Sequence, residues 1–477
     1  MPTSPKLDAA TLAANLAETC PPLGPQAARR EAERCLYCFD APCIRACPTA
    51  IDIPAFIRKI ADDNPTGAAR TILSANILGA SCARVCPTAE LCEGACVVRG
   101  EPAGPVPIGR LQRFATDAVA AASPRALLPP SAPPTGRRVA VVGGGPAGLG
   151  CAAELARLGH SVVVYEKRPR AGGLNTHGVA YYKMRPEVSL AEVALVASLG
   201  VQFRYGEELG RTITLPHLEL EYAAVFLGLG LSGGRRLGIP GENLPGVVDA
   251  LEFLEQIRLR PPAEVPVGHV VAVIGGGNTA IDAARHAHRL GARRVICVCR
   301  RGPRELAAYP DEVAHARAEG VEFVFHARPA ACEPDASGHV AALRLDPHAP
   351  PAAVNDEGYV LEVDMVIRAI GQPPAGLAGN QWLPGLEFTP RGDIARDPLT
   401  GATNRPGVFA GGDCANGGRE VVHAVAEGRR AARAIHTRLT GEIPPELIQA
   451  SGRGALSADG PASKTPPHAP LTGGHHG

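Results

Sequence analysis

Residues 138–167 read "RVAVVGGGPAGLGCAAELARLGHSVVVYEK", and this stretch decides the fold of the chain around it. An apolar run is followed by a glycine-rich turn, a helical pattern and a second apolar run. The spacing Gly143-x-Gly145-x-x-Gly148 predicts a dinucleotide-binding turn, in which glycines permit a tight bend, close backbone approach to a pyrophosphate and close helix–strand packing. Glu166 ends the next strand, 23 residues after Gly143, where a carboxylate can accept hydrogen bonds from ribose hydroxyls.

A second unit of the same kind follows at residues 269–301, "HVVAVIGGGNTAIDAARHAHRLGARRVICVCRR", with Gly275-x-Gly277-x-x-Ala280 at its turn. Its second strand leads into Arg300 and Arg301, where an acid would be expected. Guanidinium groups can bind a 2′-phosphate in bidentate fashion, which favours NADPH over NADH. The alternative is that one or both arginines are simply solvated at a strand end.

Residues 404–435, "NRPGVFAGGDCANGGREVVHAVAEGRRAARAI", present a further strand, a glycine turn with Asp413, and a helix. Because this stretch comes after the second unit, the first domain is predicted to be interrupted by the second and completed here. The expected class is α/β, with two nested Rossmann-like domains behind an α-helical, cysteine-rich domain. The expected domains are a partly helical lead-in over 1–30, a helical iron–sulfur domain over 31–121, a Pro-rich linker over 122–136, an FAD domain over 137–240 and 372–440, an NAD(P)H domain over 241–371, and a disordered tail over 441–477.

This arrangement resembles the flavoprotein family with two dinucleotide-binding domains. The turns "GLGL" (228–231) and "AIGQ" (369–372) resemble its domain-crossing turns, and "AGGL" (171–174) resembles its flavin-contacting loop. The resemblance implies that Asp413 binds the flavin ribityl chain. The residues expected at FAD are Gly143, Gly145, Pro146, Ala147, Gly148, Glu166, Lys167, Gly173, Leu174, Lys183, Gly412 and Asp413, and those expected at NADP are Gly275, Gly277, Asn278, Thr279, Arg300, Arg301, Ala369 and Gly371.

Many members of that family use a redox-active cysteine pair beside the flavin. The cysteines of this region are Cys151, Cys297, Cys299, Cys332 and Cys414, and the flavin half has no pair at a suitable spacing. The sequence therefore argues against disulfide reductase chemistry, and electrons are expected to leave the flavin by another route.

That route is predicted at residues 35–48, "CLYCFDAPCIRACP", and 82–96, "CARVCPTAELCEGAC", which together hold eight of the 14 cysteines. Clustered thiolates suit zinc or iron–sulfur clusters. A run of four cysteines that ends in Cys-Pro is typical of ferredoxins, and zinc carries no electrons from a flavin, so two [4Fe–4S] clusters are favoured over structural zinc. Counting alone would divide the eight cysteines into two sets of four.

With "PIGRLQRFATD" (107–117), these stretches resemble the N-terminal cluster domain of dihydropyrimidine dehydrogenase and of the related glutamate synthase small subunit. The resemblance implies one cluster on Cys35, Cys38, Cys43 and Cys96, and another on Cys47, Cys86, Cys92 and Gln112, with Cys82 left as a non-ligand. An acidic residue is expected at position 112 in the glutamate synthase subunit, so glutamine favours pyrimidine reduction. Without the resemblance, Gln112 would be interpreted as a polar residue on a helix face.

The chain resembles the separate flavoprotein subunit of bacterial NAD(P)-dependent dihydropyrimidine dehydrogenase, which works with an FMN subunit. This resemblance implies a relay with no catalytic side chain in this chain: hydride passes from NADPH to FAD, and single electrons pass through the clusters to an FMN-containing partner subunit that reduces uracil or thymine. The alternatives are a glutamate synthase small subunit or a paralogue with another acceptor, and a non-catalytic docking subunit with structural clusters.

Composition agrees with a soluble enzyme of several domains. The 477 residues carry 48 basic and 47 acidic side chains, for a net charge of +1, so there is no electrostatic case for nucleic acid or an anionic membrane. No run approaches the roughly 18 apolar residues of a membrane helix, and the N-terminus lacks a signal-peptide pattern. We therefore expect a cytoplasmic location.

Overall fold

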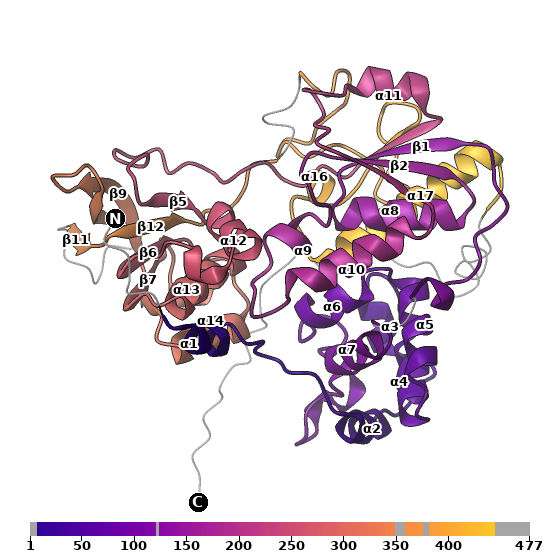
Figure 1. The fold of residues 1–477 in the computed structure, drawn as a ribbon, viewed down its shortest axis with the longest axis horizontal. Coiled ribbons are helices and arrows are strands. Elements are labelled where there is room, and N and C mark those ends of the chain that lie inside the picture. The colour runs from indigo at the N-terminus through magenta and orange to yellow at the C-terminus, as the bar shows by residue number, and fades with distance from the viewer. Residues whose placement is uncertain (1–6, 121–123, 349–357, 375–380, 444–477) are drawn as a thin grey trace, which may run out of the picture.

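The computed structural model describes residues 7–120, 124–348, 358–374 and 381–443 (Figure 1). Three groups of elements follow one another along the chain: a group of helices, a parallel sheet with its covering helices, and a second parallel sheet inserted into the first. The fold is therefore α/β with a helical unit in front of it, as the sequence predicts. Most of the tail expected to be disordered, residues 444–477, lies outside the described residues.

The helical unit is built from short helices, several of which start at proline or at a capping side chain. Asp52 and Asn64 each accept a hydrogen bond from the first turn of the helix that follows, which satisfies amides that have no partner inside the helix. Its core holds Ile53, Phe56 and Leu111. The elements are α2 (Pro25–Glu33), α3 (Pro42–Ala46), α4 (Ile53–Ala61), α5 (Pro65–Ala75), α6 (Gly79–Val85), η1 (Val97–Gly100), α7 (Ile108–Ala118) and η2 (Pro124–Leu127).

The first sheet has the strand order β13-β4-β1-β2-β3 and is parallel throughout. Its strands are β1 (Arg138–Val142), β2 (Ser161–Glu166), β3 (Gln202–Tyr205), β4 (Ala224–Leu227) and β13 (Val408–Ala410). Its helices are α8 (Pro146–Arg157), α9 (Leu174–His177), α10 (Pro186–Ala197), α11 (Leu215–Glu221), α16 (Asp413–Asn416) and α17 (Val421–Thr440). Because β13 follows the whole inserted unit, the last part of the chain completes this sheet.

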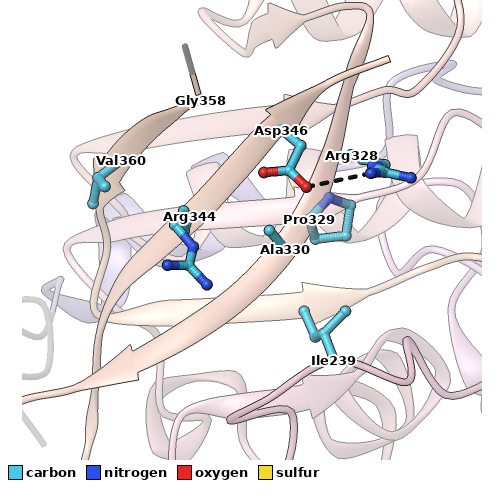
Figure 2. Close-up of a pocket in the computed structure, with 8 residues that line it drawn as sticks. All are labelled: Ile239, Arg328, Pro329, Ala330, Arg344, Asp346, Gly358 and Val360. Atoms are coloured by element: carbon cyan, nitrogen blue, oxygen red, sulfur yellow. Dashed lines mark hydrogen bonds and ion pairs between the residues drawn. The ribbon is translucent and has the colours of Figure 1, made fainter. Parts of the chain in front are cut away.

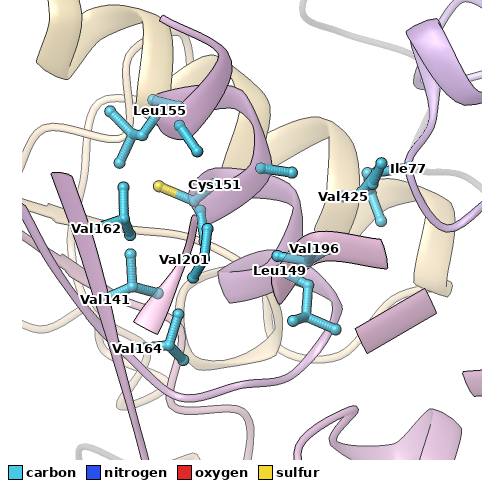
Figure 3. Close-up of a cluster of buried hydrophobic side chains, with 14 of the residues drawn as sticks. Ile77, Val141, Leu149, Cys151, Leu155, Val162, Val164, Val196, Val201 and Val425 are labelled. Atoms are coloured by element: carbon cyan, nitrogen blue, oxygen red, sulfur yellow. The ribbon is translucent and has the colours of Figure 1, made fainter. Parts of the chain in front are cut away.

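The core of the first sheet also includes side chains from the helical unit. Figure 3 shows Val141 and Val162 of the sheet with Leu149 and Cys151 of α8, and Ile77, which follows α5, lies in the same buried cluster. This shared core fixes the helical unit against the first sheet, so the cysteines are held at a set position relative to the first glycine turn.

The second sheet has the order β5-β12-β6-β7-β8 and is also parallel. Its strands are β5 (Val247–Asp249), β6 (Val270–Ile274), β7 (Arg294–Val298), β8 (Glu322–Val324) and β12 (Met365–Arg368), and its helices are α12 (Ala250–Leu259), η3 (Pro262–Glu264), α13 (Asn278–Arg289), η4 (Pro303–Glu305) and α14 (Pro310–Ala318). An antiparallel sheet of β9 (Ala327–Pro334), β10 (Val340–Pro347) and β11 (Tyr359–Glu362) packs beside it.

The lead-in ties two units together. Helix α1 (Ala9–Asn15) contacts η3, and Leu12 and Leu16 are buried in the core of the second sheet. Farther along, the Arg113 guanidinium of α7 donates a hydrogen bond to the carbonyl of Cys20 at 2.6 Å. The lead-in therefore spans from the second sheet to the helical unit, and α2 of that unit begins six residues before the expected boundary at residue 31.

Candidate functional site

Two glycines of the first turn have no room for a side chain. Gly143 has φ of +100°, and a Cβ added there would lie 2.3 Å from the carbonyl oxygen of Gly228. A Cβ at Gly148 would lie 1.9 Å from the carbonyl oxygen of Gly143. Helix α8 begins at Pro146 with Gly145 as its N-cap, so the free amides of its first turn face the turn. This is the geometry that binds a pyrophosphate at a helix N-terminus.

Glu166 holds this turn from the end of β2. Its carboxylate accepts hydrogen bonds from the amides of Gly144 and Arg168, both at 2.8 Å. The next residue, Lys167, is more exposed, and its ammonium lies 3.8 Å from a carboxylate oxygen of Glu208. The buried carboxylate of Glu166 thus lies at the turn, where the resemblance places the ribose of FAD.

Two other segments converge on the same turn. A Cβ at Gly173 would lie 2.8 Å from the Cα of Gly145, and a Cβ at Gly412 would lie 2.8 Å from the Cβ of Ala147. Asp413 begins α16 there, and burial raises the pKa of its carboxyl. The turn, the loop of Gly173 and the return segment therefore form one backbone cradle, which fits a ligand such as FAD that approaches the main chain closely.

The loop beside this cradle contains a buried amide without a partner. Asn175 is 1% exposed, and neither atom of its side-chain amide has a hydrogen-bond partner within the described protein. Buried amides are rarely left unpaired in native structures, so this position fits contact with a bound group. No sequence motif identified Asn175, because its burial depends on the helices packed around it.

Arg258 of α12 fixes that loop. Its guanidinium donates to the carbonyls of Asn175, Thr176, Val179 and Met184, at 2.6 to 2.8 Å. Burial lowers the pKa of Arg258 to about 10. The segment that directly follows the predicted flavin-contacting loop (171–174) is therefore held by a side chain of the inserted unit.

Lys183, expected near the flavin, is directed to the inserted unit. Its ammonium lies 2.8 Å from Asp282 of α13 and 2.8 Å from Glu312 of α14. The two carboxylates compensate for burial and raise the pKa of Lys183. The contacts in this structure therefore assign Lys183 to the contact between the units, and its flavin contact stays a prediction. Leu174, in the same loop region, is 42% exposed.

The second glycine turn repeats the geometry of the first. Gly275 has φ of +146°, and a Cβ there would lie 2.3 Å from the carbonyl oxygen of Ala369, while Gly277 has no atom near its Cβ position within 4 Å. Asn278 begins α13, and its side-chain oxygen accepts a hydrogen bond from the amide of Tyr309 at 3.0 Å. Thr279 is exposed, and Gly371 adopts φ of +92° beside the crossing turn. The position of Gly277 is therefore open to a ligand.

Arg300 and Arg301 follow β7 and are exposed. We expect Arg300→Ala and Arg301→Ala each to raise the KM for NADPH about tenfold, because each variant would lose one hydrogen bond to the charged 2′-phosphate. The KM for NADH should stay unchanged. Steady-state kinetics of flavin reduction with both nucleotides checks this. Arg293→Ala is the matched control, because Arg293 is exposed and directly precedes the first residue of β7. An equal effect on both nucleotides would show that the arginines do not read the 2′-phosphate.

The first set of cysteines lines one cavity in the helical unit. Cys35, Cys38, Cys43 and Cys96 share it with apolar side chains that include Ile53, Ile57 and Val106. Burial raises the pKa of Cys43 to about 11. Such thiols ionise only when a metal replaces their protons, and a dry, thiol-lined cavity fits an iron–sulfur cluster. The structure thus brings together the four cysteines that the resemblance groups.

The second set lies at the end of α6. Burial raises the pKa of Cys92, and the neighbouring thiol of Cys47 raises it further. Cys47 and Cys82 also lie close enough to Cys86 to raise the pKa of its thiol. Gln112 is buried on α7, and its amide nitrogen donates to the carbonyl of Gly79 at 2.7 Å. Its amide oxygen is therefore the atom that would bind iron.

Outside the two glycine turns and the cysteines, the described residues include a hollow but no grouped metal ligands. Among the described residues, no three His, Cys, Asp or Glu side chains are grouped as ligands of one metal ion. A further hollow of about 630 Å³ lies on the antiparallel sheet, where Arg328 pairs with Asp346 at 3.4 Å (Figure 2). No residue predicted to bind a cofactor lines this hollow.

Helix α10 connects the flavin-side loop to α6, the helix that ends at Cys86. Ser189 lies 2.8 Å from the Thr176 hydroxyl in that loop. Three residues later, the Glu192 carboxylate accepts hydrogen bonds from the amide and hydroxyl of Ser81, which precedes Cys82 in α6. Burial raises the pKa of Glu192 to about 7. One face of α10 thus contacts both the predicted flavin loop and the predicted cluster helix.

Comparison with known families agrees with this geometry. Residues 137–428 match the family described as pyridine nucleotide-disulphide oxidoreductase. The chain belongs to this family. Residues 12–123 match dihydropyrimidine dehydrogenase domain II, described with a 4Fe–4S cluster. The chain is therefore an NAD(P)H-dependent flavoprotein oxidoreductase with a 4Fe–4S domain, as predicted, and its cofactors are FAD, iron–sulfur clusters and NAD(P)H.

Curated relatives carry several names at the same similarity. A glutamate synthase [NADPH] small chain from Halomonas elongata is 36% identical over 90% of this chain and 94% of its own length. The NAD-dependent dihydropyrimidine dehydrogenase subunit PreT of Escherichia coli O157:H7 is 36% identical over 89% of this chain and 98% of its own. AegA of Escherichia coli K12, named as an oxidoreductase, is also 36% identical, and the match spans 65% of its length.

Solved structures agree on the fold. FprA from Mycobacterium tuberculosis in complex with NADPH superposes with a TM-score of 0.52 at 21% identity, over 68% of this chain and 90% of its own. Thioredoxin reductase from T. acidophilum gives a TM-score of 0.51 at 20% identity, over 63% and 99%. Within the described residues, no helix has the length and apolar content needed to cross a membrane.

Proposed function

We propose that this chain is the electron-input subunit of a dihydropyrimidine dehydrogenase. It takes hydride from NADPH and supplies single electrons, through two [4Fe–4S] clusters, to an FMN-containing partner subunit in which uracil or thymine is reduced to its 5,6-dihydro form. The relatives named PreT and the match of residues 12–123 to dihydropyrimidine dehydrogenase domain II support this proposal.

FAD, when bound, converts a two-electron hydride donor into a source of single electrons for iron–sulfur clusters. The residues of this chain position these groups. Gly143, Glu166 and Asp413 lie at the turn and the return segment where FAD would bind, and Gly277 leaves space at the second turn for NADPH. No side chain here needs to act as an acid or base toward the pyrimidine, because that chemistry would belong to the partner.

The contacts of α10 support an order for the two clusters. Ser189 and Glu192 join the flavin-side loop to α6, which leads to Cys86. The cluster on Cys47, Cys86 and Cys92 would then receive electrons first, and the cluster in the cavity of Cys35 would pass them out of the chain.

Gln112 is the observation that carries the choice of pyrimidine reduction. Its buried amide nitrogen donates to the carbonyl of Gly79 in α6, so its amide oxygen is the atom left for the iron ligation that the resemblance implies. A neutral amide there matches the ligand that the resemblance to dihydropyrimidine dehydrogenase implies, whereas the glutamate synthase subunit is expected to carry an acid. The second candidate function is that of a glutamate synthase small subunit, which the 36% identity to the small chain of Halomonas elongata supports.

Reconstitution with each partner tests the proposal. We expect uracil-dependent NADPH oxidation when the chain is mixed with an FMN subunit of dihydropyrimidine dehydrogenase, and only background oxidation without it. NADPH should bleach both the flavin and the iron–sulfur absorbance of the isolated chain. The chain would instead be a glutamate synthase small subunit if it supported turnover of glutamine and 2-oxoglutarate with a glutamate synthase large subunit, and none of uracil. Clusters that neither NADPH nor dithionite bleaches would indicate a docking subunit.

A further inference from the structure

The segment that follows η4 is fixed to the second glycine turn by its backbone. The amides of Ala307 and Ala308 both donate to the carbonyl of Gly276 at 3.0 Å. The next amide, that of Tyr309, donates to the side-chain oxygen of Asn278 at 3.0 Å. Three consecutive residues are therefore held against the turn where NADPH is predicted to bind.

The side chain of Tyr309 extends from this turn to the flavin unit. Its hydroxyl donates a hydrogen bond to the carboxylate of Glu420, the N-cap residue of α17. The same carboxylate lies 2.7 Å from Nδ1 of His423, one turn into that helix. Because Glu420 has a second partner on its own helix, the phenol meets an acceptor that is held in place.

Glu420 is joined in turn to Asp413, the predicted flavin contact. The carboxylate of Asp413 accepts a hydrogen bond from the amide of Arg419 at 3.2 Å, and Arg419 directly precedes Glu420. Consecutive contacts therefore connect Asp413 to the phenol of Tyr309, whose backbone binds Asn278. The two ends of this series are residues expected at FAD and at NADP.

We propose that Tyr309 is a positioning residue that holds the second glycine turn at a fixed distance from the return segment of the flavin unit, and so aligns the nicotinamide with the flavin. The step that it serves moves one hydride, with its two electrons, from NAD(P)H to FAD. The rate of such a step depends steeply on alignment, since a displacement of about 1 Å can cost about a hundredfold.

Other contacts between the two units should survive the loss of this bond. The ammonium of Lys183 lies 2.8 Å from Asp282 and 2.8 Å from Glu312, and Arg258 donates to four carbonyls of the flavin-side segment. These contacts act through helices α12 to α14, whereas Tyr309 acts at the turn. Removal of the phenol hydroxyl should therefore change the alignment and leave the melting temperature and the flavin content unchanged.

Stopped-flow reduction of the flavin in the isolated full chain separates the limiting rate from the dissociation constant of the nucleotide. In Tyr309→Phe the limiting rate should fall about tenfold. The dissociation constant for NADPH should stay unchanged, because the backbone bonds to the turn remain. NADH should show the same fall in rate, since the phenol contacts the flavin unit and does not read a 2′-phosphate. Tyr359→Phe is the matched control, because Tyr359 is exposed on β11, and it should keep the wild-type rate.

Variants of Glu420 test whether the effect depends on this one hydrogen bond. Tyr309→Phe combined with Glu420→Ala should be no slower than the slower single variant, because both changes remove the same bond. Glu420→Gln retains an acceptor oxygen and should be faster than Glu420→Ala.

Three results would overturn the inference. The first is an unchanged limiting rate in Tyr309→Phe, and the second is a double variant in which the two losses multiply. The third is a slower rate accompanied by a larger dissociation constant and a lower melting temperature, which would make Tyr309 a structural residue only.

The inference rests on the proposed function only in the transfer of hydride from NAD(P)H to FAD, and its measurements use no partner subunit. A chain that reacts with no FMN subunit, yet shows the slower flavin reduction in Tyr309→Phe, would disprove the proposed function and support the role of Tyr309. A chain that supports uracil reduction, with a normal limiting rate in Tyr309→Phe, would support the proposed function and overturn the inference.

Discussion

Cys43→Ala is expected to remove one whole iron–sulfur cluster, to lower the iron and acid-labile sulfide of the purified chain by about half, and to leave its flavin content unchanged. The rate of electron transfer to any protein acceptor should fall at least about a hundredfold, because one of the two clusters that carry single electrons would be absent. Reduction of the flavin itself by NADPH should continue at the normal rate.

The reason lies in the cavity that Cys43 lines. Its sulfur shares an apolar pocket with Cys35, Cys38 and Cys96, and no other cysteine lines that pocket among the described residues. Each iron of a cluster needs a donor atom from the protein, and the alanine side chain supplies none. Cys96→Ala should give the same loss, although position 96 is far from position 43 in the sequence.

Cys332→Ala is the matched control, because Cys332 is a buried thiol packed beside the second sheet. It should keep all the iron and the full rate. Iron and sulfide analysis, the EPR spectrum of the reduced chain, and stopped-flow reduction of the flavin are the measurements. If Cys43→Ala retained its full iron content, the first cavity would not be a cluster site. The predicted division of the ligands between two clusters would then be wrong.

The two dinucleotide units were predictable from sequence because their chemistry is local. A glycine with φ of +100°, followed five residues later by one whose Cβ would meet a carbonyl at 1.9 Å, can be recognised as a spacing before any fold is known. The return of β13 to the first sheet was also predictable, because a strand, a glycine turn and a helix follow the second unit and are expected to complete the first domain. These elements give the α/β class.

The contacts between units were not predictable in this way. Asn175 and Arg258 are 83 residues apart and belong to different units, yet the carbonyl of one accepts a hydrogen bond from the other. The same holds for Glu192 and Ser81, which are 111 residues apart. Such pairs depend on how the packed units meet, and neither residue stands in a motif. The ion pairs of Lys183 with the carboxylates of α13 and α14 were likewise not predictable from sequence, and its flavin contact stays a prediction.

The grouping of the cysteines lies between these cases. Spacing alone indicates thiolate ligands in the two stretches, but it cannot say that Cys96 joins Cys35 instead of Cys92. The resemblance implied that pairing, and the fold places both residues on one cavity. The role of Gln112 depends entirely on its burial against α6, which a helix pattern in sequence does not reveal.

Gly277→Ala is expected to raise the KM for NADPH at least about tenfold while the melting temperature and the flavin content stay at wild-type values. The added methyl group would meet no protein atom within 4 Å, and the residue has no positive φ that alanine would resist. The protein itself should therefore tolerate the change. A pyrophosphate that approaches this part of the turn would not, because the second glycine of the motif allows that approach.

This selectivity makes Gly277 a sharper test than the first glycine of either turn, where alanine would collide with the protein's own backbone. Gly100→Ala is the matched control, since position 100 is exposed and equally open around its Cβ. Thermal unfolding and stopped-flow reduction of the flavin over a range of NADPH concentrations are the measurements. Dithionite should reduce the flavin and clusters of Gly277→Ala as it does those of wild type, because it needs no nucleotide site. An unchanged KM in Gly277→Ala would mean that NADPH docks elsewhere on the second sheet, whereas a lowered melting temperature would mean that the open space at this turn is occupied by the protein in solution.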